Sequence, residues 1–205
     1  EPNEIIEDVL RCCEIGITMV HLHARDKEGV PTYDPEIYGE ILSGIRKYQP
    51  DLICGVSLSG RNFNEFEKRS AALNLTGNSK PDTGSLTTSS LNFNLQESIN
   101  SPEMVKKLSA IMQEKRILPE IEVFDSGMIN YAKYLIKKGL IKGPCYFNVL
   151  FGSIANAQAN ILEVAMTKSQ LPLDSYWSFA GIGRTQLQMN TLSIVLGGGV
   201  RVGLE

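Results

Sequence analysis

The chain has 205 residues, 42% of them hydrophobic and 21% charged, as is usual for a water-soluble globular domain. A net charge of −3, with both signs interspersed, argues against nucleic acid or an anionic membrane as a partner. No apolar run approaches the ~20 residues that span a bilayer, and no signal peptide is recognisable. We therefore expect a single cytoplasmic domain over residues 1–205.

The four cysteines indicate neither a disulfide framework nor a cysteine-rich metal site. Cys12, Cys13, Cys54 and Cys145 contain no C-x-x-C pair, and nothing else suggests a small secreted protein. We predict that all four are reduced and pack as small buried hydrophobic groups, Cys54 and Cys145 within strands.

Helix and strand patterns alternate along the chain. The first helix is predicted over 3–15, where apolar residues recur at helical spacing before Gly16, and the first strand over 17–26. Asp34, Pro35 and Glu36 form a cap-then-proline start for the second helix. The later patterns predict strands over 51–60, 84–88, 117–125, 144–152, 174–183 and 197–205, and helices over 63–73, 101–115, 128–139, 156–168 and 185–197.

This alternation predicts a parallel sheet covered by helices, and more specifically a TIM (β/α)8 barrel. An open doubly wound sheet gathers ligands at one switch point, whereas a barrel gathers polar groups from many strand ends at one face. Several predicted strands carry such groups near their carboxyl ends: His21, His23, Ser57, Ser59, Thr87, Thr88, Glu122, Arg201 and Glu205. Since the chain begins with a helix and offers seven strands, we expect part of a longer protein, without the first strand and the C-terminal end.

His21 and His23 are predicted to hold a catalytic divalent metal ion. Residues two apart on a strand point to the same face, about 6.6 Å from one another along the strand, so both imidazoles can reach one ion. These are the two histidines of the chain. The alternative is a pair of hydrogen-bonded core histidines without a metal.

A catalytic zinc commonly takes three protein ligands and keeps one position open. Glu205 is the favoured third ligand, because it ends the last predicted strand, which in a barrel lies near the first strands. Glu120, Glu122 and Asp125 are competing candidates for the same role.

Six motifs together resemble the beta-keto acid cleavage enzymes: HLHARD, SLSGR, KPDTGSLTTSSLNF, PEIEVFD, GIGR-x-Q and GGGVRVGLE. The resemblance runs in order over nearly the whole chain. It implies a TIM barrel whose zinc is held by His21, His23 and Glu205. It also implies a Claisen-type exchange, in which a 3-keto acid and acetyl-CoA become acetoacetate and a new acyl-CoA. Two family residues fall outside this sequence: the acidic base that follows the glutamate ligand, and a substrate-binding glutamate of the first strand.

Arg201 resembles the family's catalytic arginine and is expected to bind the substrate carboxylate or stabilise an oxyanion. Glu122 is its expected anionic partner in catalysis, although the two can also form a purely structural ion pair. Ser57 resembles a family residue that hydrogen-bonds substrate, and Ser59, Ser85 and Thr87 are further candidates for substrate contact; each can instead be a satisfied strand-end hydroxyl.

Gly181, Gly183 and Arg184, in the motif GIGR, open a helix after a strand, where backbone amides can meet coenzyme A. The alternative is a tight turn. Two other functions remain open: a metal-dependent lyase or aldolase that needs no acetyl-CoA, and a structural zinc barrel that binds a partner. The identity of the keto acid is not specified by the sequence, and family resemblance suggests a homo-oligomer.

Overall fold

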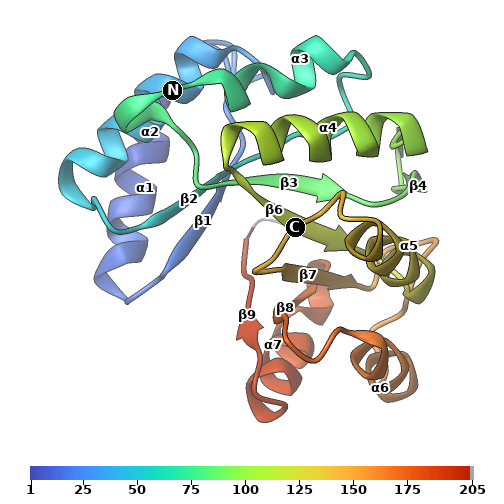
Figure 1. The fold of residues 1–205 in the computed structure, drawn as a ribbon. Helices are drawn as coiled ribbons and strands as arrows, with labels where there is room; N and C mark the ends of the chain where they lie inside the picture. Colours follow the sequence, from blue (N-terminus) through green and yellow to red (C-terminus); the bar gives the residue numbers. More distant parts are fainter. Residues whose placement is uncertain (204–205) are drawn as a thin grey trace. The chain divides into compact units, whose positions relative to one another are not determined.

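A computed structural model of the chain describes residues 1–203 (Figure 1). These residues divide into two compact units. The first unit contains residues 1–85 and 111–118, and the second contains residues 86–110 and 119–203. Because β3, α4 and β6 have residues in both, each unit is described by its own contacts.

The first unit alternates helices with parallel strands. Strand β2 pairs with both β1 and β3, and His21 lies opposite Gly55 in the pairing of β1 with β2. Its elements are α1 (Pro2–Glu14), β1 (Met19–Leu22), α2 (Pro35–Tyr48), β2 (Ile53–Val56), α3 (Phe66–Ser70), the 3-10 turns η1 (Ala71–Asn74) and η2 (Gly77–Ser79), and β3 (Thr83–Thr87).

Helix α2 shows how the sequence builds this unit. The Asp34 carboxylate accepts a hydrogen bond from the Glu36 amide at 2.9 Å, and Pro35 occupies the first turn, as predicted. Ile41 and Ile45 on its inner face are fully buried. Gly44 lets α2 approach α1 closely, because a Cβ at that position would lie 2.3 Å from the Ile6 side chain.

The second unit repeats the pattern. Strands β6, β7, β8 and β9 pair in parallel and in that order. Phe147, Phe151 and Phe179 on β7 and β8 are fully buried. Its elements are the antiparallel β4 (Leu91–Asn92) and β5 (Glu97–Ser98), α4 (Pro102–Lys115), β6 (Leu118–Val123), α5 (Ser126–Lys137), β7 (Tyr146–Phe151), α6 (Ile161–Gln170), β8 (Tyr176–Gly181), η3 (Gly183–Thr185), α7 (Gln186–Val195) and β9 (Gly199–Val200).

The predicted order of helices and strands is confirmed over residues 1–203, but several boundaries were wrong. The predicted helix 156–168 begins at Ile161, because Asn160 caps it by accepting a hydrogen bond from the Glu163 amide at 3.0 Å. The predicted helix 63–73 begins at Phe66 and ends in a 3-10 turn. The hairpin of β4 and β5 was not predicted, because two-residue strands carry no periodicity.

The structure corrects two predictions about the cysteines. Cys54 and Cys145 are buried as expected, and burial raises the pKa of the Cys54 thiol to about 11. Cys12 is exposed and Cys13 is partly exposed, since Val9 is the one buried residue of α1. Cys145 immediately precedes β7 and does not lie in it.

Within residues 1–203, no helix has both the length and the apolar character needed to cross a membrane. The longest helices have 14 residues, whereas a span needs ~20.

Candidate functional site

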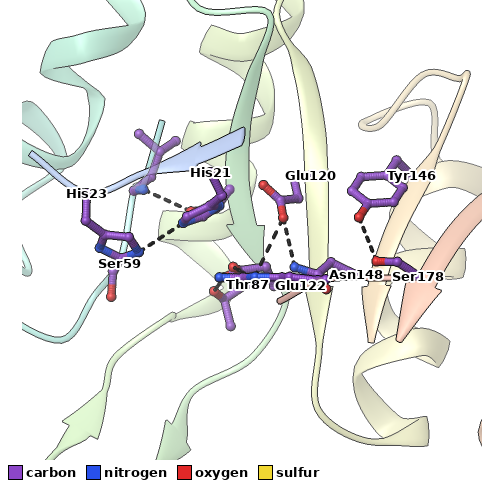
Figure 2. Close-up of polar contacts among 12 residues, drawn as sticks. His21, His23, Ser59, Thr87, Glu120, Glu122, Tyr146, Asn148 and Ser178 are labelled. Carbon is purple, nitrogen blue, oxygen red and sulfur yellow. Dashed lines mark hydrogen bonds and ion pairs between the residues drawn. The ribbon is translucent and has the colours of Figure 1, made fainter. Parts of the chain in front are cut away.

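The two histidines meet at the carboxyl end of β1. His21 lies within the strand and His23 follows its last residue, while the intervening Leu22 is buried on the other face. The Nε2 atoms of the two rings lie 3.1 Å apart, and the ring planes are inclined by 43° (Figure 2). Both side chains are half-buried. The predicted convergence of the imidazoles is therefore present.

The spacing of the two Nε2 atoms fits a shared metal ion. Two nitrogens bound to one tetrahedral zinc at ~2.0–2.1 Å lie roughly 3.3 Å apart, close to the observed 3.1 Å. Two imidazole lone pairs that face each other repel unless a cation or a proton lies between them. A hydrogen bond between the rings also places a proton between the two lone pairs. The geometry therefore agrees both with a shared metal ion and with a hydrogen-bonded histidine pair without a metal.

The hydroxyl groups beyond β2 and on β3 have local partners. The Ser85 hydroxyl, which is 2% exposed, accepts a hydrogen bond from the Leu58 amide at 2.9 Å. The Ser59 hydroxyl accepts one from the Arg61 amide at 3.2 Å. The Ser57 amide donates to the Leu22 carbonyl at 3.0 Å, which fixes the segment beyond β2 against the end of β1. These bonds give Ser59 and Ser85 structural roles, and their contact with substrate stays a prediction.

A pocket of about 450 Å³, including space open to solvent, lies in the first unit. His23, Ser57 and Ser59 line it together with residues that the sequence did not single out: Tyr33, Phe63, Lys68 and Arg69. Tyr33 and Phe63 lie in loops, and Lys68 and Arg69 lie in the short helix α3. Their proximity to His23 became apparent only from the structure.

In the second unit, Arg201 forms the predicted ion pair. Its guanidinium Nη1 lies 3.2 Å from Glu122 Oε1 and 3.8 Å from Glu120 Oε1. The side chains of Arg201 and Glu122 are each 13% exposed. The two glutamates are two residues apart on β6 and therefore share one face of the strand. The pairing with Glu122 is confirmed, and the pairing with Glu120 is an addition.

Neighbouring polar side chains hold both carboxylates. The Thr87 hydroxyl donates to Glu122 Oε2 at 2.8 Å, so both oxygens of Glu122 are engaged. The Asn148 amide nitrogen donates to Glu120 Oε1 at 2.8 Å, and both residues are almost completely buried (Figure 2). This network holds Arg201 in place, and Thr87 belongs to it.

Tyr146 faces Ser178 across β7 and β8, with 2.6 Å between the two hydroxyl oxygens (Figure 2). Burial, followed by the charge of Glu120, raises the pKa of Tyr146 to about 12, although the hydrogen bond with Ser178 opposes the shift. Tyr146 therefore keeps its proton throughout the neutral range.

The stability of the protein is expected to fall between pH 10 and 12, partly through Tyr146. Its pKa of about 12 lies above the ordinary value of 10, so its contribution is complete below pH 10 and is lost as pH rises towards 12. Tyr146→Phe should reduce this loss by about 1–2 kcal/mol. Urea unfolding of the wild type and of Tyr146→Phe at pH 9 and pH 11.5 measures this loss of unfolding free energy. Tyr38, whose pKa burial also raises to about 12, contributes equally to both proteins. An equal loss of stability in the wild type and in Tyr146→Phe would show that Tyr146 does not cause it.

The segment that begins at Gly181 forms a tight strand-to-helix turn. A Cβ on Gly181 would lie 2.3 Å from the Thr185 carbonyl oxygen, and Gly183 has a positive φ of 57°. Arg184 is exposed. These observations favour the turn alternative for the glycines, and coenzyme A binding by Gly181, Gly183 and Arg184 stays a prediction.

Gly181→Ala is expected to destabilise the protein by about 3 kcal/mol, because the added methyl group meets backbone and not a flexible side chain. Gly183→Asn is the matched control, since no atom would contact its Cβ and asparagine tolerates the left-handed region. Chemical unfolding of both variants gives the two free energies. A smaller effect for Gly181→Ala than for Gly183→Asn would show that the turn is not tight.

Asp125, a competing candidate for the third metal ligand, caps α5 by accepting a hydrogen bond from the Met128 amide at 3.0 Å, and it also accepts one from Asn156 at 2.9 Å. Both its oxygens are thus engaged, which weakens Asp125 as a metal ligand. Glu205, the favoured third ligand, lies outside the described residues.

Comparison with known proteins gives a consistent match. The model of the beta-keto acid cleavage enzyme family matches residues 1–205. A 3-oxoadipate:acetyl-CoA acetyltransferase of Cupriavidus necator is 38% identical over 99% of this chain and 71% of its own length. A 3-keto-5-aminohexanoate cleavage enzyme of Fusobacterium nucleatum is 36% identical over 98% of this chain and 72% of its own length.

Among solved structures, apo ObcA superposes on the whole chain with a TM-score of 0.84 at 19% identity. The chain spans 54% of the length of that protein. At this low sequence identity, the likeness shows only that the two folds are similar. The likeness confirms the predicted fold class, the α/β class of the TIM barrel.

Proposed function

Because the chain belongs to the beta-keto acid cleavage enzyme family, we propose that it catalyses cleavage of a 3-keto acid with acetyl-CoA. In this exchange the C2–C3 bond of the keto acid breaks, and its first two carbons join the acetyl group to give acetoacetate. The remaining acyl group leaves on coenzyme A, so all atoms are conserved. The names of the two similar relatives, one a cleavage enzyme and one an acetyl-CoA acetyltransferase, support this reaction.

We propose a zinc ion as cofactor, with His21, His23 and Glu205 as its ligands. The observation that most supports a metal ion is the 3.1 Å distance between the two Nε2 atoms, which matches the spacing of ligands on one tetrahedral ion. Two histidines and one carboxylate are also the donor set of catalytic zinc sites that keep a position open, in contrast to closed, cysteine-rich structural sites. When bound, zinc would supply Lewis-acid polarisation of the substrate carbonyl.

Arg201 is proposed to bind the substrate carboxylate or the developing oxyanion, with Glu122 as its catalytic partner. The ion pair at 3.2 Å supports this role, because it orients the guanidinium. Ser57 is proposed as a second catalytic group that hydrogen-bonds the reacting end of the keto acid. Ser59, Ser85 and Thr87 are proposed to line the same substrate site.

The proposed partners are small molecules: the keto acid, and acetyl-CoA as co-substrate. Gly181, Gly183 and Arg184 are proposed to contact coenzyme A through backbone amides and one exposed cation. We further propose a cytoplasmic homo-oligomer that binds neither nucleic acid nor membranes; the net charge of −3 agrees with this.

The test is a panel of 3-keto acids assayed on the intact protein with and without acetyl-CoA. Acyl exchange predicts acetoacetate only when both compounds are present. Turnover of a keto acid without acetyl-CoA would instead favour the second candidate, a metal-dependent lyase or aldolase. The histidine pair favours that alternative equally, since a Lewis acid serves both reactions.

A further inference from the structure

The residues that line the pocket of the first unit form two groups that differ in chemistry. The first group, which we call the histidine end, contains His23, Ser57 and Ser59, which lie at or just beyond the carboxyl ends of β1 and β2. The second group, which we call the loop end, contains Tyr33 and Phe63 from the loops after those strands and Lys68 from α3. Because both groups line one pocket, a single ligand can contact both.

Lys68 is the cation at the loop end. Its Nζ lies 5.4 Å from the centre of the Tyr33 ring and 5.9 Å from that of Phe63. These two rings form an edge-to-face pair with centres 4.8 Å apart. The aromatic pair provides an apolar wall for methylene groups and leaves the ammonium group at the end of that wall.

The ion pair of Lys68 with Glu65 leaves the ammonium group available for a ligand. The two groups lie 2.7 Å apart, but 54% of the glutamate side chain and 37% of the lysine side chain are exposed. Ion pairs between solvent-exposed partners contribute little to stability, so the ammonium can turn to an anion inside the pocket. Glu65 is not among the residues that line the pocket.

Lys68 and Arg69 are the charged residues among those described that line the pocket, and both are cations. Arg69, which is 4% exposed, lies in its wall and donates from Nε to the Leu58 carbonyl at 2.8 Å. Of the described residues that line the pocket, none is an aspartate or a glutamate. A ligand group with negative charge is therefore favoured here, and an ammonium group is disfavoured.

We propose that this pocket receives the far end of the keto acid, and that Lys68 binds a carboxylate there. The substrate class is then the 3-keto dicarboxylic acids. This inference rests on the proposed function, in which the histidine end of the pocket holds the reacting end of the substrate. Tyr33 and Phe63 would contact the methylene groups between the two ends.

The test compares three keto acids of equal length, ending in a carboxylate, a methyl group or an ammonium group. Lys68→Met should lower kcat/KM for the diacid about 10- to 100-fold, mainly through KM, because one charge-assisted hydrogen bond is lost. It should leave kcat/KM for the methyl-ended acid within about twofold. Lys68→Glu should shift the preference to the ammonium-ended acid.

The matched control is Lys47→Met on α2. That lysine also lies over an aromatic ring, 5.2 Å from the centre of Tyr48, but it does not line the pocket. It should change none of the three rates. Should Lys68→Met fail to fold, Lys68→Gln removes the same charge with a polar side chain and carries the same expectation.

Each other outcome has a definite meaning. An equal loss on all three acids would show that Lys68 binds a group common to every reaction, and would overturn the assignment. Repeating the assay with acetyl-dephospho-CoA then tells a coenzyme A phosphate from the first carboxylate of the keto acid. A wild-type protein that cleaves the methyl-ended acid but not the diacid overturns this inference and leaves the proposed function intact. Cleavage of none of the three overturns the proposed function.

Discussion

Replacing His21 by alanine is expected to remove bound zinc from the intact protein and to lower kcat/KM at least 10³-fold. The two Nε2 atoms lie 3.1 Å apart and are both proposed to bind the ion, so the remaining imidazole alone cannot hold it. Loss of Lewis-acid stabilisation costs several kcal/mol in the transition state, which corresponds to roughly 10³-fold or more in rate. Elemental analysis gives the metal content independently of activity. His23→Ala should have the same effect.

Cys12→Ala is the matched control for this experiment. Cys12 is an exposed thiol on α1, and an exposed thiol can bind metal ions adventitiously. The variant should keep one zinc per chain and full activity. Stoichiometric zinc in both histidine variants would contradict the metal site, and the two rings would then be a hydrogen-bonded pair.

The same measurement separates the candidates for the third ligand. Glu205→Gln should lower zinc content if Glu205 completes the site. Glu122→Gln should leave the zinc content unchanged, since both oxygens of Glu122 are engaged by Thr87 and Arg201. Loss of zinc from Glu122→Gln alone would move the ligand role to Glu122.

Replacing Arg201 by methionine is expected to destabilise the protein by about 3–5 kcal/mol, because it leaves charged carboxylates buried without their cation. Glu120 is 2% exposed and Glu122 is 13% exposed, so water cannot readily compensate. In addition, kcat/KM should fall about 10²- to 10³-fold, as expected when one oriented donor to an oxyanion is removed. Denaturant unfolding and steady-state kinetics measure the two effects separately.

A double-mutant cycle tests the cause of that destabilisation. Combining Arg201→Met with Glu122→Gln should recover part of the lost stability, because the second change removes one of the uncompensated charges. It should not recover activity. Strict additivity of the two stability changes would contradict an energetic link between Arg201 and Glu122.

Much of the fold could be predicted from the sequence, because burial imposes strong patterns. Amphipathic helices such as 128–139 and apolar strands such as 144–152 alternate at short intervals, and the structure has α5 and then β7 at these places. Boundaries were less certain where capping competes with periodicity. At α6, Asn160 begins the helix later than its apolar residues suggest.

The site could be predicted where chemistry was concentrated in a short motif. The two histidines of HLHARD and the pairing of Arg201 with Glu122 are examples. Asn148 and Tyr146 were missed, because single polar residues in an apolar strand do not reveal their partners in sequence. Their signal was an asparagine inside the buried run YFNVLF, which needs a hydrogen-bonding partner.

Isotopic labelling of the acetyl group tests the proposed reaction most directly. The intact protein is incubated with a 3-keto acid and acetyl-CoA that carries ¹³C in both acetyl carbons, and the acetoacetate formed is analysed by NMR. Acyl exchange predicts the label in carbons 3 and 4 of acetoacetate, and an unlabelled acyl-CoA derived from the keto acid. Acetoacetate without label, or consumption of the keto acid while acetyl-CoA stays intact, would contradict it.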